Sequence, residues 1–437
     1  MKQKVVASLV SAAMVATLFA GCGSSSTATS SASKADSSSA AASSAASSSA
    51  EDTAAASSSS AAEESTSSAS SEAVEATSTA STSASSSSDD SGWTNLDQFD
   101  GLKANEAYEF PIIVKSFQST YWQAALKGMD KASEELGVTY TAQGPNSESD
   151  IADQVNMLNS AISSSPKGIG LAACDTSSVL DSLQTCADKG IPVVAFDTGI
   201  ADAPEGSMAC TVVTDNTAAG ATAADGMWEA IEDKVKNADG QVRIGEVSQD
   251  ATALNIQQRT LGFVNEMIKL IQKDGKTVAV TGNEYYTQNA EGADGDEGSA
   301  DVVIEVAVPA QTTVELCSTE AQTILSKEDT IAIFGSNQTA AEGVLAADAN
   351  LSVLGSDASA GDVIAVGFDA GSTIKGAIQS GQMYGAVTQS PLMMGYYALY
   401  ALTAAANGDT LKDVDAPGYW YNADNMNDDQ IAPNLYD

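Results

Sequence analysis

Short apolar runs alternate with amphipathic segments along this chain, and this alternation constrains the fold more than any other sequence feature. Between Phe110 and Phe196, four apolar runs of strand length are separated by three segments whose apolar residues recur every three or four positions. We therefore expect strands over 110–114, 138–141, 168–172 and 191–196, and helices over 122–136, 150–163 and 177–189. Strands that alternate with helices in units of about 30 residues are typical of a parallel sheet covered by helices.

The same alternation begins again after Cys210 and runs to Gln379. It predicts strands over 211–213, 242–247, 302–308, 330–334 and 363–367, and helices over 218–234, 257–272, 319–326, 339–349 and 371–379. The acidic, glycine-rich stretch 283–301 fits neither period, and we expect an exposed insertion there. The predicted fold class is thus α/β, with two doubly wound parallel-sheet lobes, and ligands of such sheets bind beyond the carboxyl ends of the strands.

Two acidic residues stand directly after apolar runs. Asp197 follows the run that ends at Phe196, and Asp369 follows the run that ends at Phe368. An acid has no packing reason to sit at the end of a buried strand, so we expect both carboxylates to contact a ligand.

Seven segments, in the right order along the chain, resemble the periplasmic-type sugar-binding proteins of ABC importers, and more narrowly their ribose- and galactose-binding group. They are Lys115–Trp122, Ile191–Asp197, Thr214–Gly220, Arg259–Phe263, Phe334–Gln338, Val366–Ala370 and Thr388–Pro391. The resemblance covers nearly all of residues 109–437. It implies two lobes joined by a three-strand hinge, with crossovers near Cys210, Gln389 and Asp413, that close on a ligand. The expected N-terminal lobe is 108–211 with 390–413, and the C-terminal lobe is 212–389 with 414–437.

The resemblance also implies eight ligand contacts. They are Ser119, Tyr121, Trp122 and Asp197 in the first lobe, Arg259, Asn337 and Asp369 in the second, and Gln389 at the hinge. These residue types suit a sugar, because each hydroxyl both donates and accepts hydrogen bonds and needs partners of both kinds. The aromatic residues offer apolar surfaces for the face of a sugar ring.

Two positions depart from the ribose pattern. Thr198 stands where that group commonly carries Arg, and Lys115 is an unusual charge after the first strand, where it can reach an anionic or carbonyl oxygen. The ligand therefore stays open among aldopentoses, aldohexoses, cyclitols, nucleosides and furanone-type signals.

The first 92 residues indicate export and tethering. Lys2 and Lys4 precede a short apolar run, and Cys22 follows Ala-Gly, so residues 1–21 resemble a lipoprotein signal peptide with Cys22 as the lipidated residue. An ordinary signal peptide with an incidental Cys is the alternative. Residues 22–92 are nearly all Ser, Ala and Thr with scattered acids, which predicts a disordered tether, or alternatively a mucin-like stalk.

Composition excludes several classes of function. The formal net charge of −39 disfavours nucleic acid as a partner, and the lack of His excludes His-dependent triads and His-ligated metals. Four further cysteines, Cys174, Cys186, Cys210 and Cys317, leave open two disulfides or four buried thiols, of which the thiols are favoured. Calcium loops at 294–297 and 424–428 lack the required later ligands, so we expect no metal and no cofactor.

The function that the sequence predicts is a lipid-anchored, monomeric solute-binding protein at the extracellular face of a bacterial membrane. It would capture a small polyhydroxylated ligand, most simply a monosaccharide, and deliver it to an ABC permease. A ligand sensor that presents its closed form to a membrane receptor or kinase is the alternative. A glycosidase built on paired cleft acids is a more distant one.

Overall fold

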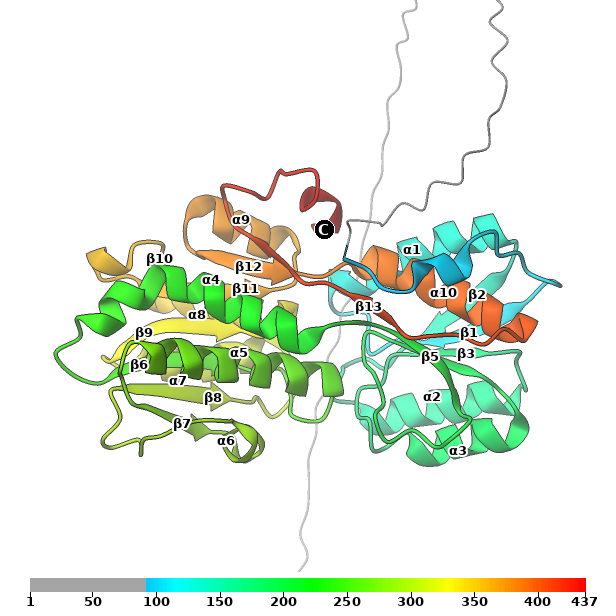
Figure 1. Ribbon diagram of the computed structural model, residues 1–437, viewed down its shortest axis with the longest axis horizontal. Helices are drawn as coiled ribbons and strands as arrows, with labels where there is room; N and C mark the ends of the chain where they lie inside the picture. The colour runs from blue at the N-terminus through cyan, green and yellow to red at the C-terminus, as the bar shows by residue number, and fades with distance from the viewer. Residues whose placement is uncertain (1–91) are drawn as a thin grey trace, which may run out of the picture. The chain divides into compact units, whose positions relative to one another are not determined.

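The computed structural model describes residues 92–437, so the expected signal peptide, Cys22 and nearly all of the tether lie outside the described residues. The described chain forms two α/β lobes, each built on one sheet (Figure 1). No helix within 92–437 is long and apolar enough to cross a membrane.

The N-terminal lobe is built on a six-stranded parallel sheet of order β13-β5-β4-β3-β1-β2. Its strands are β1 (Glu109–Ile113), β2 (Thr139–Gln143), β3 (Ile169–Leu171), β4 (Val193–Phe196), β5 (Met208–Thr214) and β13 (Val414–Ala416). One face is covered by α1 (Thr120–Leu136) and α10 (Pro391–Asn407), and the other by α2 (Ile151–Ser163) and α3 (Leu180–Lys189). Alternate residues of one strand therefore enter different cores, as Ile112 and Ile113 of β1 do.

The C-terminal lobe repeats this plan on a larger sheet of order β14-β12-β11-β9-β6-β8-β7, with β10 beside β11. Its strands are β6 (Val242–Val247), β7 (Val278–Gly282), β8 (Val302–Ala307), β9 (Thr330–Gly335), β10 (Leu354–Gly355), β11 (Val363–Phe368), β12 (Gly385–Thr388) and β14 (Tyr419–Tyr421). Its helices are α4 (Asn216–Lys236), α5 (Leu254–Lys273), α6 (Glu284–Asn289), α7 (Val314–Leu325), α8 (Gln338–Leu351) and α9 (Ser372–Ser380). Only β14, which pairs with β12, is antiparallel among the described strands.

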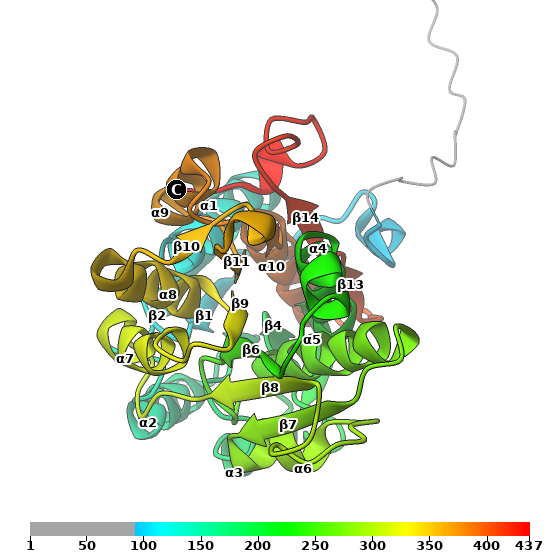
Figure 2. The same ribbon diagram turned by 90° about the vertical axis from the view of Figure 1, so that its left-hand side faces the viewer.

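Three single-turn 3-10 helices complete the described elements: η1 (Leu96–Phe99), η2 (Ala358–Ala360) and η3 (Ala432–Asn434). The segment around η1 packs on the N-terminal lobe, where Phe99 joins the core beneath α10. Figure 2, which views the molecule along the lobes, shows the helices of the C-terminal lobe on both sides of its sheet.

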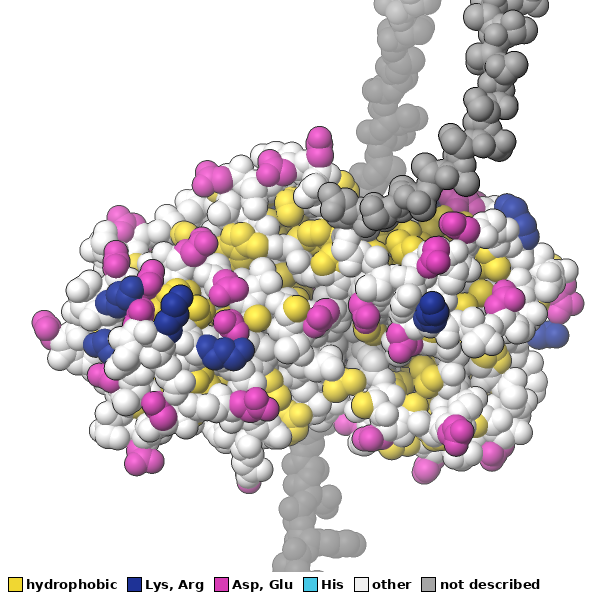
Figure 3. Space-filling view, in the orientation of Figure 1, with side chains coloured by type: hydrophobic (Ala, Val, Ile, Leu, Met, Phe, Trp, Pro, Cys, Tyr) yellow, Lys and Arg dark blue, Asp and Glu magenta, His cyan; other side chains and the backbone are white. Residues whose placement is uncertain are grey.

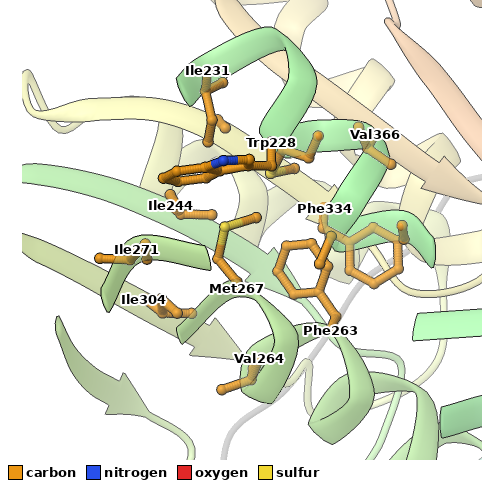
Figure 4. Close-up of a cluster of buried hydrophobic side chains, with 14 of the residues drawn as sticks. Trp228, Ile231, Ile244, Phe263, Val264, Met267, Ile271, Ile304, Phe334 and Val366 are labelled. Atoms are coloured by element: carbon orange, nitrogen blue, oxygen red, sulfur yellow. The ribbon is translucent and has the colours of Figure 1, made fainter. Parts of the chain in front are cut away.

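The larger core of the C-terminal lobe lies between its sheet and the pair α4 and α5 (Figure 4). Trp228 and Ile231 from α4, and Phe263 and Met267 from α5, converge on strand residues such as Phe334. The rings of Phe263 and Phe334 stack with centroids 4.5 Å apart. This core fixes α5 against the sheet, and α5 carries Arg259 toward the cleft.

The chain crosses between the lobes three times, and two of the predicted boundaries move. The C-terminal lobe was expected to begin at residue 212, but residues 212–214 belong to β5 of the N-terminal sheet, so the first crossover follows Thr214. Residues 414–416, expected in the C-terminal lobe, form β13 beside β5, so the third crossover lies at 417–418. The local hydrophobic pattern predicts a strand but not the sheet that it joins. A strand next to a hinge can pair with the edge strand of either lobe. The second crossover lies at Gln389 and Ser390, between β12 and α10.

The acidic stretch 283–301 is not wholly an exposed insertion, which corrects the prediction. It contains α6, whose Tyr286 is fully buried, and the preceding residues form the additional strand β7. Asp294 and Asp301 accept hydrogen bonds from the backbone N–H groups of Val278 and Thr277, 2.9 Å and 2.8 Å away. These acids therefore fix the start of β7, and no group of three or more acids or cysteines within 92–437 is arranged to hold a metal.

The four cysteines of the described chain, Cys174, Cys186, Cys210 and Cys317, are free and buried, as the favoured prediction had it. In the view of Figure 3, acidic side chains lie over both lobes, and Lys and Arg cluster at the outer end of the C-terminal lobe and are scattered over the N-terminal lobe.

Candidate functional site

All eight residues expected to contact a ligand line one cavity between the two lobes. Six further residues line it with them: Lys115, Glu148, Gln249, Asn255, Ile256 and Gln338. Nearly all follow the carboxyl ends of strands or begin helices, the positions where open α/β sheets bind ligands.

Asp197 and Asp369 occupy equivalent backbone positions in the two lobes. Each follows a buried strand, and each adopts a left-handed conformation, with φ of 64° and 74°. Residues other than glycine seldom adopt this conformation, and it is found at functional sites where the surrounding structure enforces it. The enforcing contacts include backbone hydrogen bonds from Asp197 N–H to the Val212 carbonyl (3.1 Å) and from Asp369 N–H to the Val387 carbonyl (2.7 Å).

The carboxylate of Asp197 is surrounded by donors. The Tyr121 hydroxyl donates to Oδ1 at 2.7 Å, and the Lys115 ammonium forms an ion pair with Oδ2 at 3.0 Å. Thr198 Oγ1 and Asn255 Nδ2 also donate to Oδ2, at 3.0 Å and 3.1 Å. Lys115 thus supplies the positive charge beside Asp197 that the neutral Thr198 does not. The two departures from the ribose pattern therefore have a common physical explanation.

Lys115 is almost fully buried, with 2% of its surface exposed. Burial by itself lowers the pKa of the ammonium, but the charges of Asp197, Glu148 and Asp250 outweigh this and hold the pKa above its usual value. The same ammonium donates to Asn255 Oδ1 at 3.1 Å. Lys115 was expected to contact an anionic or carbonyl oxygen of the ligand. In this closed arrangement its ammonium instead contacts a protein carboxylate and an amide oxygen.

Asp369 is held mainly by neutral donors. Gln389 Nε2 donates to Oδ1 at 2.7 Å, and the backbone N–H of Gln338 donates to Oδ2 at 3.0 Å. Burial raises the pKa of the Asp369 carboxyl, and the positive charge of Arg259 opposes this shift in part. Gln389 also accepts a hydrogen bond from Thr214 Oγ1 at 2.8 Å, so a hinge residue links Asp369 to the first crossover.

Arg259 is 1% exposed, and its guanidinium carbon lies over the Phe368 ring, 3.6 Å from the ring centroid. Its Nε and Nη2 donate to Asn216 Oδ1 at 3.2 Å and 2.7 Å, and its Nη1 donates to the Ser336 carbonyl at 2.8 Å. A guanidinium has five N–H groups, so these three bonds do not use all of its donors, and Arg259 lines the cavity.

The close approach of α4 and α5 brings Arg259 to Asn216. A Cβ on Gly220 would lie 2.1 Å from the Arg259 carbonyl oxygen, and one on Gly262 would lie 2.3 Å from the Thr217 carbonyl oxygen. Only glycine permits this approach, because real Cβ atoms do not come so near a backbone oxygen.

The aromatic pair lies deeper than the sequence suggests. Tyr121 and Trp122 are 4% and 2% exposed, and their rings meet edge to face with centroids 4.9 Å apart. Trp122 Nε1 donates to Glu148 Oε1 at 3.1 Å. Burial raises the pKa of Glu148, and the Lys115 charge lowers it in part.

Four cavity-lining side chains that the sequence did not single out bond across the cleft or beside it: Glu148, Gln249, Asn255 and Gln338. Gln249 Nε2 donates to Glu148 Oε2 at 2.6 Å, and Asn255 bonds to Lys115, Thr198 and Asp197 of the opposite lobe. Gln338 pairs with Thr120, and Asn337 Nδ2 donates to Gln249 Oε1. Gln249 and Gln338 lie just beyond β6 and β9, so the carboxyl-end rule applies to them as well. Glu148 and Asn255 sit on loops and helix starts that carry no such signal.

These contacts draw the lobes tightly together, and the cavity that remains has a volume of about 20 Å³. That is room for about one water molecule, far below the range of about 300–1,000 Å³ typical of small-molecule sites. A ligand the size of a sugar therefore requires the lobes to separate and the bonds across the cleft to exchange. The fold and the site define a two-lobed ligand-binding protein with a polar cleft at its hinge.

Comparison with known proteins identifies the family. Residues 110–410 match the family described as periplasmic binding protein domain. A solved Brachyspira murdochii protein, described as an ABC transporter, LacI family transcriptional regulator, is 28% identical with a TM-score of 0.61, over 76% of this chain and 99% of that chain. An ABC transporter solute-binding protein from Agrobacterium vitis with bound D-fucose is 25% identical with a TM-score of 0.61, over 75% of this chain and all of that chain.

A carbohydrate transporter solute-binding protein from Agrobacterium radiobacter in complex with D-arabinose shares the fold, at 23% identity and a TM-score of 0.60 over 76% of this chain and 100% of that chain. No curated protein matches the chain. The chain belongs to the periplasmic binding protein family, and its fold is that of the type I sugar-binding proteins of ABC transporters. The prediction of a solute-binding protein rather than an enzyme is thereby confirmed.

Proposed function

We propose that this protein is the lipid-anchored, extracellular solute-binding component of an ABC importer, and that a neutral monosaccharide is its ligand. The observation that carries the proposal is the cavity itself. All eight expected contacts, drawn from both lobes and from the hinge, line one cavity. Their mixture of carboxylates, amides and an arginine matches the paired donor and acceptor demand of sugar hydroxyls.

The charges around the cavity favour a neutral ligand over an acidic one. Three lining residues are acidic, Glu148, Asp197 and Asp369, and two are basic, Lys115 and Arg259. Lys115 is already paired with Asp197, and Arg259 is bonded to Asn216 and to the Ser336 carbonyl. A ligand carboxylate or phosphate would add a fourth negative charge beside these three acids. Of the two lining cations only Arg259 is not already in an ion pair, so a neutral ligand is favoured over an acidic one.

Binding would proceed by opening and closing of the lobes about the three crossovers. In the closed arrangement the donors and acceptors of the cleft satisfy one another, as Asn255 and Asp197 do at 3.1 Å. A sugar that replaces these bonds with its own hydroxyls stabilises the closed form by its differential affinity for the closed and open states. The closed form is then the signal that the permease recognises.

Isothermal titration calorimetry of the purified chain tests the ligand class. The probes are D-fucose, D-arabinose, D-galactose and D-glucose, with D-glucuronate and D-galacturonate as charged counterparts of two of them. We expect saturable binding of at least one neutral sugar and none of the uronates. Binding of a uronate more tightly than its neutral counterpart contradicts the charge argument, and binding of no sugar contradicts the proposed function.

Lipid anchoring rests on the sequence around Cys22 and has its own test. Cys22→Ser should release the protein into the medium or leave it as an uncleaved precursor. Globomycin-type inhibition of lipoprotein processing in the expressing bacterium provides the matched control for the wild type. A Cys22→Ser protein that stays mature and membrane-bound contradicts the anchor.

Delivery to a permease is separated from sensing by uptake. Deletion of the gene in its own bacterium should abolish uptake of the radiolabelled sugar that calorimetry selects, and re-expression should restore it. Uptake that persists while a transcriptional response to the sugar is lost would instead identify a sensor.

A further inference from the structure

The segment after β14 contacts both lobes beside the cleft, and no sequence pattern predicted this contact. Ile431 and Leu435 pack against the core of the C-terminal lobe beneath α8 and α9. Tyr436, the next residue, packs instead against the core of the N-terminal lobe. Figures 1 and 2 both show the end of this segment lying between α9 and α1.

Backbone and side-chain groups of Tyr436 hold the turn that follows Asp369. The Ala370 N–H donates to the Tyr436 hydroxyl at 3.3 Å, and the Gly371 N–H donates to the Tyr436 carbonyl at 3.1 Å. From β14, the Tyr421 hydroxyl donates to the Asp369 carbonyl at 2.7 Å. Each of the three residues of this turn therefore has one backbone group held, by Tyr421 of β14 for Asp369 and by Tyr436 for Ala370 and Gly371.

The turn needs this support because its backbone is strained. Asp369 has a φ of 74° and Gly371 has a φ of 102°. Both values lie in the region that residues other than glycine avoid. A non-glycine residue in such a conformation costs of order 1–3 kcal/mol and persists only where its surroundings enforce it. Asp369 is the residue in this turn that faces the cavity.

The ring of Tyr436 also reaches the opposite lobe. It meets the ring of Tyr121 edge to face, with centroids 6.0 Å apart, and the Tyr121 hydroxyl donates to Asp197. Burial and the charge of Asp369 raise the pKa of the Tyr436 hydroxyl well above its usual value, so this hydroxyl stays protonated. A continuous set of contacts therefore joins Asp197, Tyr121, Tyr436 and the Asp369 turn.

We propose that Tyr436 is a positioning residue of the sugar site, which holds the Asp369 turn in its binding conformation and couples it to Tyr121 when the lobes close. The inference rests on the proposed function, because Asp369 is there a ligand contact. It predicts that Tyr436 affects sugar affinity through Asp369 rather than through overall stability.

The test compares Tyr436→Phe and Tyr436→Ala with Tyr140→Phe. Tyr140 is the matched control, since its hydroxyl bonds Asp130 and the Leu126 carbonyl at the surface of the N-terminal lobe. We expect Tyr436→Phe to weaken calorimetric affinity for the best-bound panel sugar about 3–10-fold, Tyr436→Ala to weaken it further, and Tyr140→Phe to change it less than about twofold. Equal effects of the two Phe substitutions overturn the proposal.

A double-mutant cycle separates positioning from general packing. In an Asp369→Asn background, the additional effect of Tyr436→Phe on affinity should largely disappear, because both changes act on one interaction. A full, additive effect there contradicts the proposed role.

Hydrogen exchange decides the structural half of the inference without any ligand. Tyr436→Phe should accelerate exchange of the Ala370 amide, measured by NMR or mass spectrometry on the full chain, while the Tyr140→Phe protein exchanges there like the wild type. Unchanged exchange at Ala370 overturns the positioning role. Absence of sugar binding by the wild type, in contrast, overturns the proposed function and leaves this measurement to judge Tyr436.

Discussion

In each lobe an aspartate follows an equivalent buried strand, and the two lobes stabilise this aspartate with different partners. Asp197 and Asp369 share a left-handed backbone and deep burial. Asp197 is paired with a buried cation, Lys115, at 3.0 Å. Asp369 is held by the Gln389 amide and a backbone N–H.

This difference separates stability from binding. A buried ion pair is strongly destabilising to break from one side, because it leaves a charge without a partner. A carboxyl held by neutral donors leaves a smaller penalty when it is removed. We therefore expect the first lobe's acid to contribute to folding and binding together, and the second lobe's acid to contribute mainly to binding.

The largest expected effect follows from Lys115. Lys115→Met should lower the free energy of unfolding by about 3–5 kcal/mol, because it leaves the buried carboxylates of Asp197 and Glu148 without their cation. Lys167→Met is the matched control, since Lys167 pairs with Glu106 at 3.2 Å on the surface, and should cost about 1 kcal/mol or less. Urea denaturation measures both, and equal losses would contradict the ion-pair account.

The second effect compares the two acids directly. Asp369→Ala should weaken sugar affinity about ten- to a hundredfold, as expected for loss of a charge-assisted hydrogen bond. Asp197→Ala should weaken affinity as well but should also lower the melting temperature more, because Lys115 then lacks its carboxylate. Calorimetry and thermal denaturation of the two variants give both quantities. A larger loss of stability for Asp369→Ala would reverse the comparison.

There is a physical reason why the sequence predicted some residues of this site and missed others. The ends of β4 and β11 are visible because an acid after an apolar strand conflicts with packing, and the hinge Gln389 is visible through the family segment. Tyr436 gives no such signal, since the local sequence does not say where a segment after the last strand will run. Asn255 likewise reaches Asp197 only through the packing of one lobe on the other.

The same limit explains the two displaced boundaries. Residues 211–213 are extended as expected, whereas no strand was predicted over 414–416. The local sequence pattern could not say that Val212–Thr214 pairs with Val414–Ala416 in the N-terminal sheet. Strand periodicity is local, whereas pairing is a property of the assembled sheet.

The smallest expected effect is a change in how stability depends on pH. It concerns Glu246, a buried acid of the C-terminal lobe that does not line the cavity. Glu246 on β6 is fully buried, and neither of its carboxyl oxygens accepts a hydrogen bond from the described residues. Burial raises its pKa well above the ordinary 4.5, and the neighbouring Thr260 and Arg259 oppose this only in part. The folded state therefore keeps a proton that the unfolded chain releases above about pH 4.5.

Because the folded state binds more protons in this window, its stability falls as pH rises from the unfolded pKa through the folded one. Glu246→Gln should flatten that decline, and Glu229→Gln, at an exposed position on α4, should leave it unchanged. Urea denaturation between pH 4.5 and 8 measures the slope. An identical slope in the Glu246→Gln protein would show that Glu246 does not titrate as its burial implies.

The central claim is that the sugar is held between the lobes and stabilises their closure. The direct measurement is the distance between spin labels on Asp153→Cys in α2 and Thr319→Cys in α7, exposed positions near the Ser149–Thr312 contact across the cleft. The four cysteines of the described chain are buried, which favours labelling at the new sites. Adding the sugar should narrow the distance distribution of the full chain to a single value, because the sugar selects one closed form. Tight binding with an unchanged distribution would contradict a site between the lobes.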